Sequence, residues 1–328
     1  MYEIIMNIAY FGSPILSAEL LDSLFNVNTL DIKLIVTQPD KPAGKSLSMK
    51  PTAVKTCAQT HTTSIFDKSL DEISEKALID LFRMHNIDLG IVFAYGVIIP
   101  QNVLKSTQYG FWNIHPSLLP LYRGASPTIF PILLGDTKTG ITLIQMNEEM
   151  DQGDIIGQKE IQIQDSASRI DIERQIAPIA TKMVAQAVDT LQKNGTIEIR
   201  PQIHKGATYT RRITKQDGYA PFELIKDSLT GGGRTHVTEQ LEIVSWYYGH
   251  NKLLTTPVQN PAKLIWNMYR TLVGWPGIWT TINTNRGKKR LKIVKMNFDG
   301  RALSLETVQL EGKNEVSFQK FNKAYNII

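Results

Sequence analysis

The sequence predicts an α/β protein with a Rossmann-like, mostly parallel sheet, followed by a smaller β-rich region. Two patterns carry this prediction. In roughly the first two-thirds of the chain, short apolar runs alternate with stretches of helical periodicity, which is the arrangement of parallel βαβ units. In the remainder, short β-type runs are separated by turns such as Asp299–Gly300, as in a small barrel or sandwich.

Besides residues 155–163, which alternate only loosely, the first region contains five strand candidates, each a short apolar run bounded by turn residues. They are Asn7–Phe11, Ile32–Val36, Asp88–Ala94, Phe111–His115 and Ile141–Met146. The first strand leads through a glycine turn into a helix, as in dinucleotide-binding folds. However, the glycines of G-x-G-x-x-G are absent, so a nicotinamide or flavin dinucleotide is disfavoured.

Composition predicts two domains and a linker. Residues 1–194 form the Rossmann-like domain, residues 195–215 form a linker that contains the basic pair Arg211-Arg212, and residues 216–328 form the second domain. The linker is assigned from its proline and glycine content and its lack of periodicity.

Charge is unevenly distributed along the chain. Residues 1–204 hold 17 Lys and Arg against 22 Asp and Glu, a balance of −5, whereas residues 205–328 hold 19 against 9, a balance of +10. A basic second part favours a polyanionic partner. On charge alone, an ordinary solvated face is an equally good explanation.

Cysteine content and hydropathy indicate the cellular compartment in which we expect the protein. Cys57 is the only cysteine, which excludes an internal disulfide and suits a reducing environment. No apolar run approaches the ~18 residues that a membrane span needs. The first residues lack the basic leader and cleavage site of a signal peptide and resemble a first strand. We therefore expect a cytoplasmic protein that does not bind membranes, and we expect a monomer.

Residues 37–54 form a connection rich in Pro, Gly and Lys, and loops of this length are often functional. Lys41, Lys45 and Lys50 would make it a flexible basic strip. The run Gly44-Lys45-Ser46 resembles the end of a phosphate-binding loop, but Pro39 occupies the place of its first glycine, which argues against a nucleotide triphosphate site. A solvated loop without a function is the alternative.

Three polar side chains lie at, or just after, the ends of two of the predicted strands. Asn113 and His115 alternate with apolar residues, so both point to one face at the end of a strand. Asp151 lies in a Gly-containing turn after the run 141–146. If the two strands are neighbours in a parallel sheet, their carboxyl ends lie side by side, where open α/β sheets bind ligands.

These side chains can catalyse a transfer that has no covalent enzyme intermediate. No Ser or Cys lies in a nucleophile elbow, and the six histidines show no metal-ligand spacing. The amide of Asn113 can donate to an oxyanion, His115 can donate or shuttle a proton, and Asp151 can orient the imidazole and stabilise its charge. Each residue alone is more often structural, and only the three together favour catalysis.

At these residues the sequence resembles the formyltransferase family that uses 10-formyltetrahydrofolate. The shared motifs are N-I-H-P-S-L-L-P-x-Y-R-G-A-S-P (113–127), T-G-I-T-L (139–143) and M-D-x-G-D-I (150–155). T-Q-P-D-K-P-A-G-K (37–45) with P-T-A-V-K (51–55) resembles the insertion loop of the members that act on methionyl-tRNA, and G-W-P-G (274–277) resembles the start of their C-terminal barrel, which is OB-like. The likeness covers residues 5–210 well and 259–310 weakly.

The resemblance implies a reaction and a set of site residues. The formyl group of 10-formyltetrahydrofolate would pass to the α-amine of methionine on initiator tRNA, without a metal. The implied residues are Asn113, His115 and Asp151 for catalysis; Ser117, Leu118, Leu119 and Pro120 beside the folate; and Lys41, Lys45, Lys50, Arg211 and Arg212 for tRNA.

Two alternatives stay open. An amino-sugar nucleotide N-formyltransferase would share the chemistry but would not need the basic loop or the basic second domain. A non-catalytic tRNA-binding module would have a decayed site. Two features depart from the family pattern: Lys45 replaces the usual arginine, which keeps the charge but loses the planar fork, and residues 216–258 match no family motif.

Overall fold

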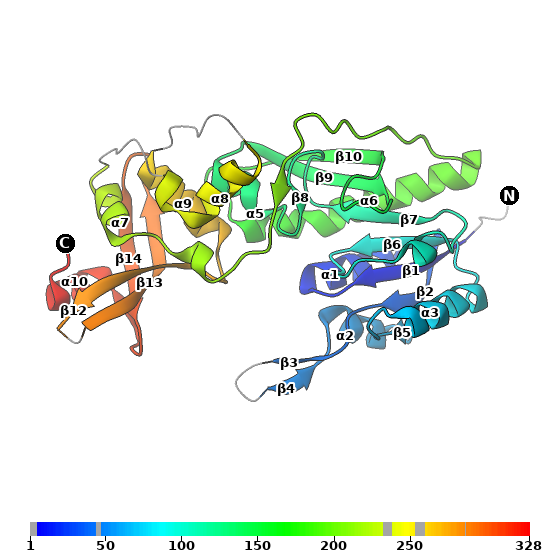
Figure 1. The fold of residues 1–328 in the computed structure, drawn as a ribbon, viewed down its shortest axis with the longest axis horizontal. Coiled ribbons are helices and arrows are strands. Elements are labelled where there is room, and N and C mark those ends of the chain that lie inside the picture. The colour runs from blue at the N-terminus through cyan, green and yellow to red at the C-terminus, as the bar shows by residue number, and fades with distance from the viewer. Residues whose placement is uncertain (1–4, 44–46, 232–237, 253–259, 286) are drawn as a thin grey trace. The chain divides into compact units, whose positions relative to one another are not determined.

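The computed structural model describes residues 5–43, 47–231, 238–252, 260–285 and 287–328 (Figure 1). The chain forms two compact units. Unit 1 comprises Met1–Ala125, Thr139–Ile161 and Glu173–Ala207, and unit 2 comprises Ser126–Lys138, Gln162–Ile172 and Thr208–Ile328. The sequence suggested a single domain boundary within the linker 195–215. The chain does pass from unit 1 to unit 2 within that linker, between Ala207 and Thr208, but two earlier segments also belong to unit 2.

Unit 1 is built on a seven-stranded sheet in the order β10-β9-β7-β6-β1-β2-β5. Its strands are β1 (Met6–Gly12), β2 (Leu30–Val36), β5 (Ser64–Phe66), β6 (Leu89–Phe93), β7 (Phe111–His115), β9 (Lys138–Gln145) and β10 (Ile155–Gln162). Neighbouring strands from β5 to β7 run parallel, and β9 runs antiparallel to β7. The predicted mostly parallel sheet is confirmed.

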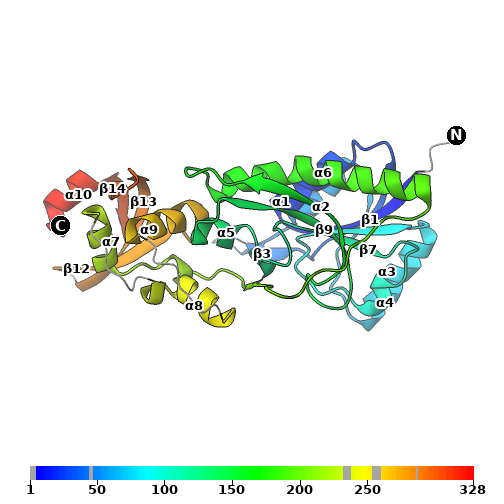
Figure 2. The same ribbon diagram turned by 90° about the horizontal axis from the view of Figure 1, so that it is seen from above.

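Continuous apolar runs explain why the central strands form. A strand covered on both faces needs apolar side chains at nearly every position, and all of β6 and all but one residue of β1 are buried. On one face Phe11 meets Tyr95 and Phe111 edge-on, with ring centroids 5.4 Å apart in each pair. α3 adds Phe82 and Leu78 to this cluster. Figure 2 shows α3 on one side of the sheet and α6 on the other.

The helices of unit 1 are α1 (Ile15–Leu24), α2 (Ala53–Thr60), α3 (Glu72–Met84), α4 (Gln101–Leu104) and most of α6 (Arg169–Asn194). Between β2 and α2, the connection expected to be a flexible strip contains a two-stranded antiparallel hairpin of β3 (Lys41–Ala43) and β4 (Ser48–Lys50). None of the helices in the described ranges is both long and apolar enough to cross a membrane.

Unit 2 contains a four-stranded antiparallel sheet in the order β12-β13-β14-β15. The strands are β12 (Ile278–Thr284), β13 (Gly287–Phe298), β14 (Leu303–Leu310) and β15 (Glu315–Ser317), and the helices are α5 (Ile129–Leu134), α7 (Phe222–Leu229), α8 (Glu242–His250), α9 (Pro261–Thr271) and α10 (Phe318–Tyr325). This sheet is consistent with the predicted small barrel-like domain. Residues 216–258, which the sequence left without an assignment, contribute α7 and α8.

Candidate active site

Asn113 and His115 lie on β7, at the carboxyl end of the parallel part of the sheet. In the register with β9, Asn113 faces Ile144 and His115 faces Thr142, and the two strands run antiparallel. The two strands are neighbours, but the condition that they run parallel is not met. A short buried run has the same apolar pattern in either direction, so its sequence does not reveal which way it runs.

Asp151 reaches the same place by a different route. It lies in the loop between β9 and β10, with a left-handed backbone of φ 58°, which is unusual for a residue other than glycine. Its Oδ2 accepts a hydrogen bond from the Gly124 amide at 2.7 Å. Its Oδ1 lies 3.3 Å from Asn113 Nδ2 and 3.4 Å from His115 Nδ1. The three predicted catalytic side chains are thus brought together, because the loop folds back rather than because two strand ends coincide.

Both ring nitrogens of buried His115 face oxygen atoms. Nε2 lies 2.9 Å from the carbonyl oxygen of Tyr122, and Nδ1 faces the Asp151 carboxylate. A carbonyl oxygen can only accept, so Nε2 is the donor in the first contact. A neutral ring would then turn an unprotonated Nδ1 toward a carboxylate, whereas a ring with a proton on each nitrogen satisfies both contacts. Nδ1 is therefore the ring nitrogen that faces the Asp151 carboxylate, while Nε2 is held by the backbone of Tyr122.

The surroundings of Asp151 favour its charged form. Burial raises the pKa of this carboxyl group, but the charge of His115, hydrogen bonds from His115 and Gly124, and the nearby guanidinium of Arg123 together lower the pKa below its ordinary value. The carboxylate is therefore ionised near neutral pH and is available as a proton acceptor.

The loop that carries Asp151 is held by a residue from the segment expected to be a linker. Gln202, which is buried, donates through Nε2 to the carbonyl oxygens of Asp151 at 3.1 Å and Gly153 at 2.8 Å. Its Oε1 accepts from Nε of buried Arg123 at 2.9 Å, and also from Nη2. Gly153 is required by close packing, because a Cβ there would lie 1.9 Å from the carbonyl oxygen of Gln145.

Sequence analysis assigned no role to Gln202 or Arg123, the two residues that hold the Asp151 loop and are called the Gln202 clamp below. Arg123 stood inside a quoted motif without a role, and Gln202 lay in the predicted linker. The two are 79 positions apart, and no local pattern links them. The available signal was a charged residue within a mostly apolar stretch, since Arg is almost never fully buried unless it is paired.

The residues predicted to border the folate form a turn after β7. Ser117 is fully buried, and its hydroxyl donates to a backbone carbonyl within the turn at 2.6 Å. The hydroxyl of Thr142 donates to the Ser117 carbonyl at 2.7 Å. Leu119 is buried, and Leu118 and Pro120 are half-buried. The turn is thus held by hydrogen bonds, and its two partly exposed side chains, Leu118 and Pro120, are apolar.

The β3–β4 hairpin presents the predicted lysines in an unusual pairing. Lys41 and Lys50 are directly opposite each other across the two strands, and both are exposed. Like charges at such positions destabilise a sheet pair, so the stability of the hairpin does not explain them. Lys41 Nζ donates to Oε1 of Gln38 at 2.5 Å, and Met49 beside Lys50 is 60% exposed. Lys45 lies outside the described residues.

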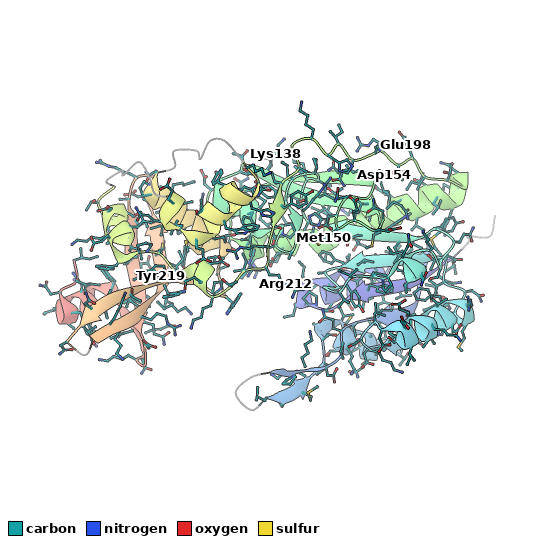
Figure 3. The ribbon with its side chains drawn as sticks, in the orientation of Figure 1. Lys138, Met150, Asp154, Glu198, Arg212 and Tyr219 are labelled. Atoms are coloured by element: carbon teal, nitrogen blue, oxygen red, sulfur yellow. The ribbon has the colours of Figure 1, made fainter. Side chains whose placement is uncertain are left out.

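The two predicted arginines of unit 2 differ. Arg211 donates from Nη1 and Nη2 to the two carboxylate oxygens of Asp217 at 2.8 and 2.7 Å, and Asp217 is buried. These hydrogen bonds, offset in part by burial, raise the pKa of Arg211, and its guanidinium also lies over the ring of Trp246. Its pairing fits a structural role within unit 2 better than a phosphate contact. Arg212 is exposed (Figure 3).

The chain matches one protein family and is similar to named enzymes from other organisms. Residues 6–188 match the model of the Formyl transferase family. The methionyl-tRNA formyltransferase of Thermotoga maritima is 35% identical over 224 residues, which cover 68% of this chain and 70% of that protein. The methionyl-tRNA formyltransferase of Leptospira interrogans is 32% identical over 323 residues, or 98% of each chain. The second alignment includes most of residues 216–258, which carry no family motif that sequence analysis could identify.

Solved structures share the fold. The N-formyltransferase from Helicobacter canadensis, solved with folinic acid and dTDP-3-aminofucose, superposes with a TM-score of 0.56 at 16% identity and covers 89% of this chain and 88% of its own. A 4-N formyltransferase from Francisella tularensis gives a TM-score of 0.55 at 16% identity, with 87% and 95% covered. At this identity the likeness shows the fold alone. The family match over more than half of the chain and the relatives above 30% identity show that this chain belongs to the formyl transferase family.

Proposed function

We propose that this chain transfers the formyl group of 10-formyltetrahydrofolate to the α-amine of methionine on initiator tRNA. The observation that carries the chemistry is the meeting of an amide, an imidazole and a carboxylate at one point, from Asn113, His115 and Asp151. Membership of the family supports the donor. The choice of acceptor rests on the likeness to methionyl-tRNA formyltransferases over the full chain.

In the first step, the amine nitrogen attacks the formyl carbon, and the carbonyl electron pair moves to the formyl oxygen. The donors of Asn113 and His115 converge on one oxygen of Asp151 at 3.3 and 3.4 Å, which is longer than ordinary hydrogen bonds. A formyl oxygen placed between the two donors would therefore gain two hydrogen bonds as it becomes negative. Removal of one such donor typically costs about 2.7–4 kcal/mol.

In the second step, protons move so that the intermediate can collapse. Asp151, held through its other oxygen by the Gly124 amide, accepts the proton that the attacking amine releases. The bond between the formyl carbon and N10 of the folate breaks, and His115 gives N10 a proton. His115 regains that proton from Asp151, so the site returns to its starting state with formyl-methionyl-tRNA and tetrahydrofolate as products.

Other residues position the reactants. Gln202 and Arg123 fix the backbone of the Asp151 loop, and the turn of Ser117, Leu118, Leu119 and Pro120 would line the folate side through apolar contact. Lys41 and Lys50 on the hairpin, together with Lys45 and Arg212, would contact tRNA phosphates. Arg211 would support the second unit through Asp217. We further propose that the protein works as a monomer in the cytoplasm, where translation begins.

An amino-sugar nucleotide N-formyltransferase is the nearest alternative, and sugar N-formyltransferases share the fold. Two opposed exposed lysines on a hairpin have no evident use with a small nucleotide sugar. A non-catalytic tRNA-binding module is disfavoured because an ionised carboxylate, an imidazole and an amide are held together at the cost of a left-handed backbone at Asp151.

The acceptor can be tested directly. We expect the purified enzyme, given 10-formyltetrahydrofolate, to formylate methionyl-initiator tRNA in preference to glycinamide ribonucleotide and a dTDP-amino sugar. Product mass would be measured for each acceptor at matched concentrations. Turnover of the amino sugar with none on methionyl-tRNA would establish the alternative, and no turnover of any acceptor would favour the binding module.

His115→Ala should lower kcat by about 10²–10⁴-fold, the usual contribution of a general acid–base group. KM for both substrates should change little, because the ring acts on charge that develops during the reaction. His85→Ala, the same substitution at the end of α3, is the matched control and should retain activity. If His115→Ala turns over like the control, His115 has no part in the chemistry.

Lys50→Ala should weaken tRNA binding and reduce its dependence on salt. Each lost phosphate contact lowers the slope of log K against log salt by up to about 0.9 on a duplex. Lys193→Ala removes a lysine that is paired with Asp189 on α6 at 2.7 Å and should leave the slope unchanged. Binding would be measured by fluorescence anisotropy over a salt series. Equal slopes for the wild type and Lys50→Ala would mean that the hairpin does not contact tRNA through this residue.

A further inference from the structure

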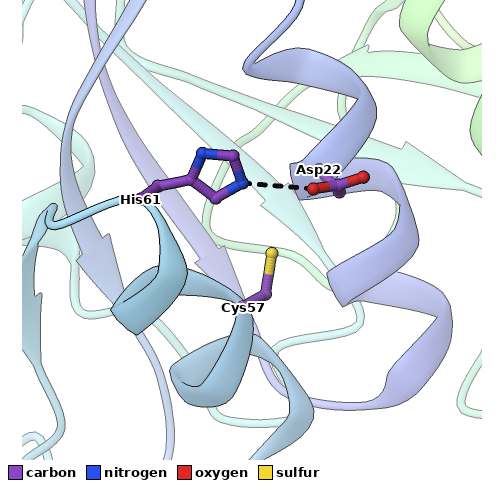
Figure 4. A group of neighbouring side chains, drawn as sticks. All are labelled: Asp22, Cys57 and His61. Atoms are coloured by element: carbon purple, nitrogen blue, oxygen red, sulfur yellow. Dashed lines mark hydrogen bonds and ion pairs between the residues drawn. The ribbon is translucent and has the colours of Figure 1, made fainter.

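Three potential metal ligands converge in unit 1, and none belongs to the catalytic cluster. Asp22 comes from α1, Cys57 from α2 and His61 from the C-cap of α2. Their ligand atoms all lie within 4.8 Å of one another, and within the described ranges no other His, Cys, Asp and Glu side chains form such a group. Figure 4 shows the three side chains pointing toward one another.

Helix geometry accounts for the arrangement. Cys57 and His61 are four positions apart at the end of α2, so they lie on one face of the helix. Asp22 lies on α1, which packs against α2. His61 Nε2 is 3.1 Å from Asp22 Oδ1. The imidazole stacks on Phe25 with a centroid separation of 3.8 Å and an angle of 13° between the rings, and this contact fixes the plane of the ring.

We propose that Asp22, Cys57 and His61 bind a divalent transition-metal ion of the zinc type. Tetrahedral zinc, with bonds of about 2.0–2.3 Å, separates its ligand atoms by about 3.4–3.6 Å, so small rotations of these side chains close the site. Sulfur and nitrogen ligands select zinc or cobalt over magnesium and calcium, which prefer oxygen. Three protein ligands leave the fourth position to water.

The ion would act as a structural link. It joins α1 to α2, and α2 directly follows the β3–β4 hairpin. Thr52 begins α2 as its N-cap by accepting from the Lys55 amide, and its hydroxyl meets that of Thr37 at 2.6 Å. A metal at the other end of α2 would therefore hold the helix at both ends and stabilise the base of the hairpin.

The surroundings of the Cys57 thiol do not suit a covalent or redox role. Cys57 is partly buried beside the carboxylate of Asp22, whereas reactive cysteines lie in electropositive surroundings. Its Sγ has a long contact of 3.8 Å with the carbonyl oxygen of Ala18. A metal ion would displace the thiol proton. A simple ion pair of Asp22 with His61 would make no use of the sulfur, and this difference can be measured.

The test uses untagged full-length protein, stripped with a chelator and titrated with cobalt chloride. We expect thiolate-to-cobalt charge-transfer absorption that saturates at one equivalent and disappears in Cys57→Ser. His61→Gln and Asp22→Asn each remove a ligand, so each should weaken cobalt binding by at least the roughly tenfold that loss of an outer-shell partner costs. His85→Gln is the matched control and should bind as the wild type does.

A second readout does not depend on cobalt absorption. Zinc chloride should raise the Tm of the wild type and not that of Cys57→Ser, because a ligand that binds only the folded state stabilises it. Cobalt bound without the charge-transfer band, or an equal zinc shift in both proteins, would overturn the proposal. Asp22→Asn alters an exposed side chain, so it tests the site even if His61→Gln folds poorly. None of these measurements depends on formyl transfer.

Discussion

The carboxylate of Asp151 is the constraint around which the rest of the site is arranged. It is buried, charged and carried by a loop, and each of these properties has to be offset by a specific contact. One oxygen is held by the Gly124 amide, and the other faces Asn113 and His115. A buried charge without such partners would neutralise by taking up a proton. The donors that keep it ionised are the same donors that would stabilise a developing oxyanion.

The backbone beneath that carboxylate explains two residues that have no direct chemistry. A left-handed conformation at Asp151 has a cost on the order of 1–3 kcal/mol and persists only where its surroundings fix it. Gln202 supplies two hydrogen bonds to the loop, and Arg123 holds Gln202 in turn. Arg123 also lowers the pKa of Asp151 through its charge. One buried arginine thus supports both the position and the ionisation of the carboxylate.

Sequence could predict the features that are encoded locally. Continuous apolar runs gave the parallel strands, and the alternation along β7 placed Asn113 and His115 on one face. The direction of β9 could not be predicted, because a short apolar run has the same pattern in either direction. The Gln202 clamp joins segments that are far apart in the chain, and local periodicity carries no trace of such a pairing. The β3–β4 hairpin was hidden for another reason: its proline, glycine and lysine content is typical of a loop.

The pKa of Asp151 gives stability a definite dependence on pH. A depressed pKa contributes stability that is fully present above the unfolded value of about 3.9 and is lost as the pH falls through the lower folded value. This contribution requires that His115 and the other donors outweigh burial. If His115 were removed, burial would count for more and the pKa of Asp151 would rise.

The most direct test is the titration of the Asp151 carboxyl carbon by NMR with ¹³C-labelled aspartate, assigned by the Asp151→Asn variant. The account predicts that the wild-type carboxyl stays ionised from neutral pH down to about pH 4, and that its midpoint moves upward in His115→Ala. Tryptophan fluorescence would confirm that the protein stays folded over that range. A wild-type carboxyl that takes up its proton above about pH 4, or a midpoint that His115→Ala leaves unchanged, would contradict the account.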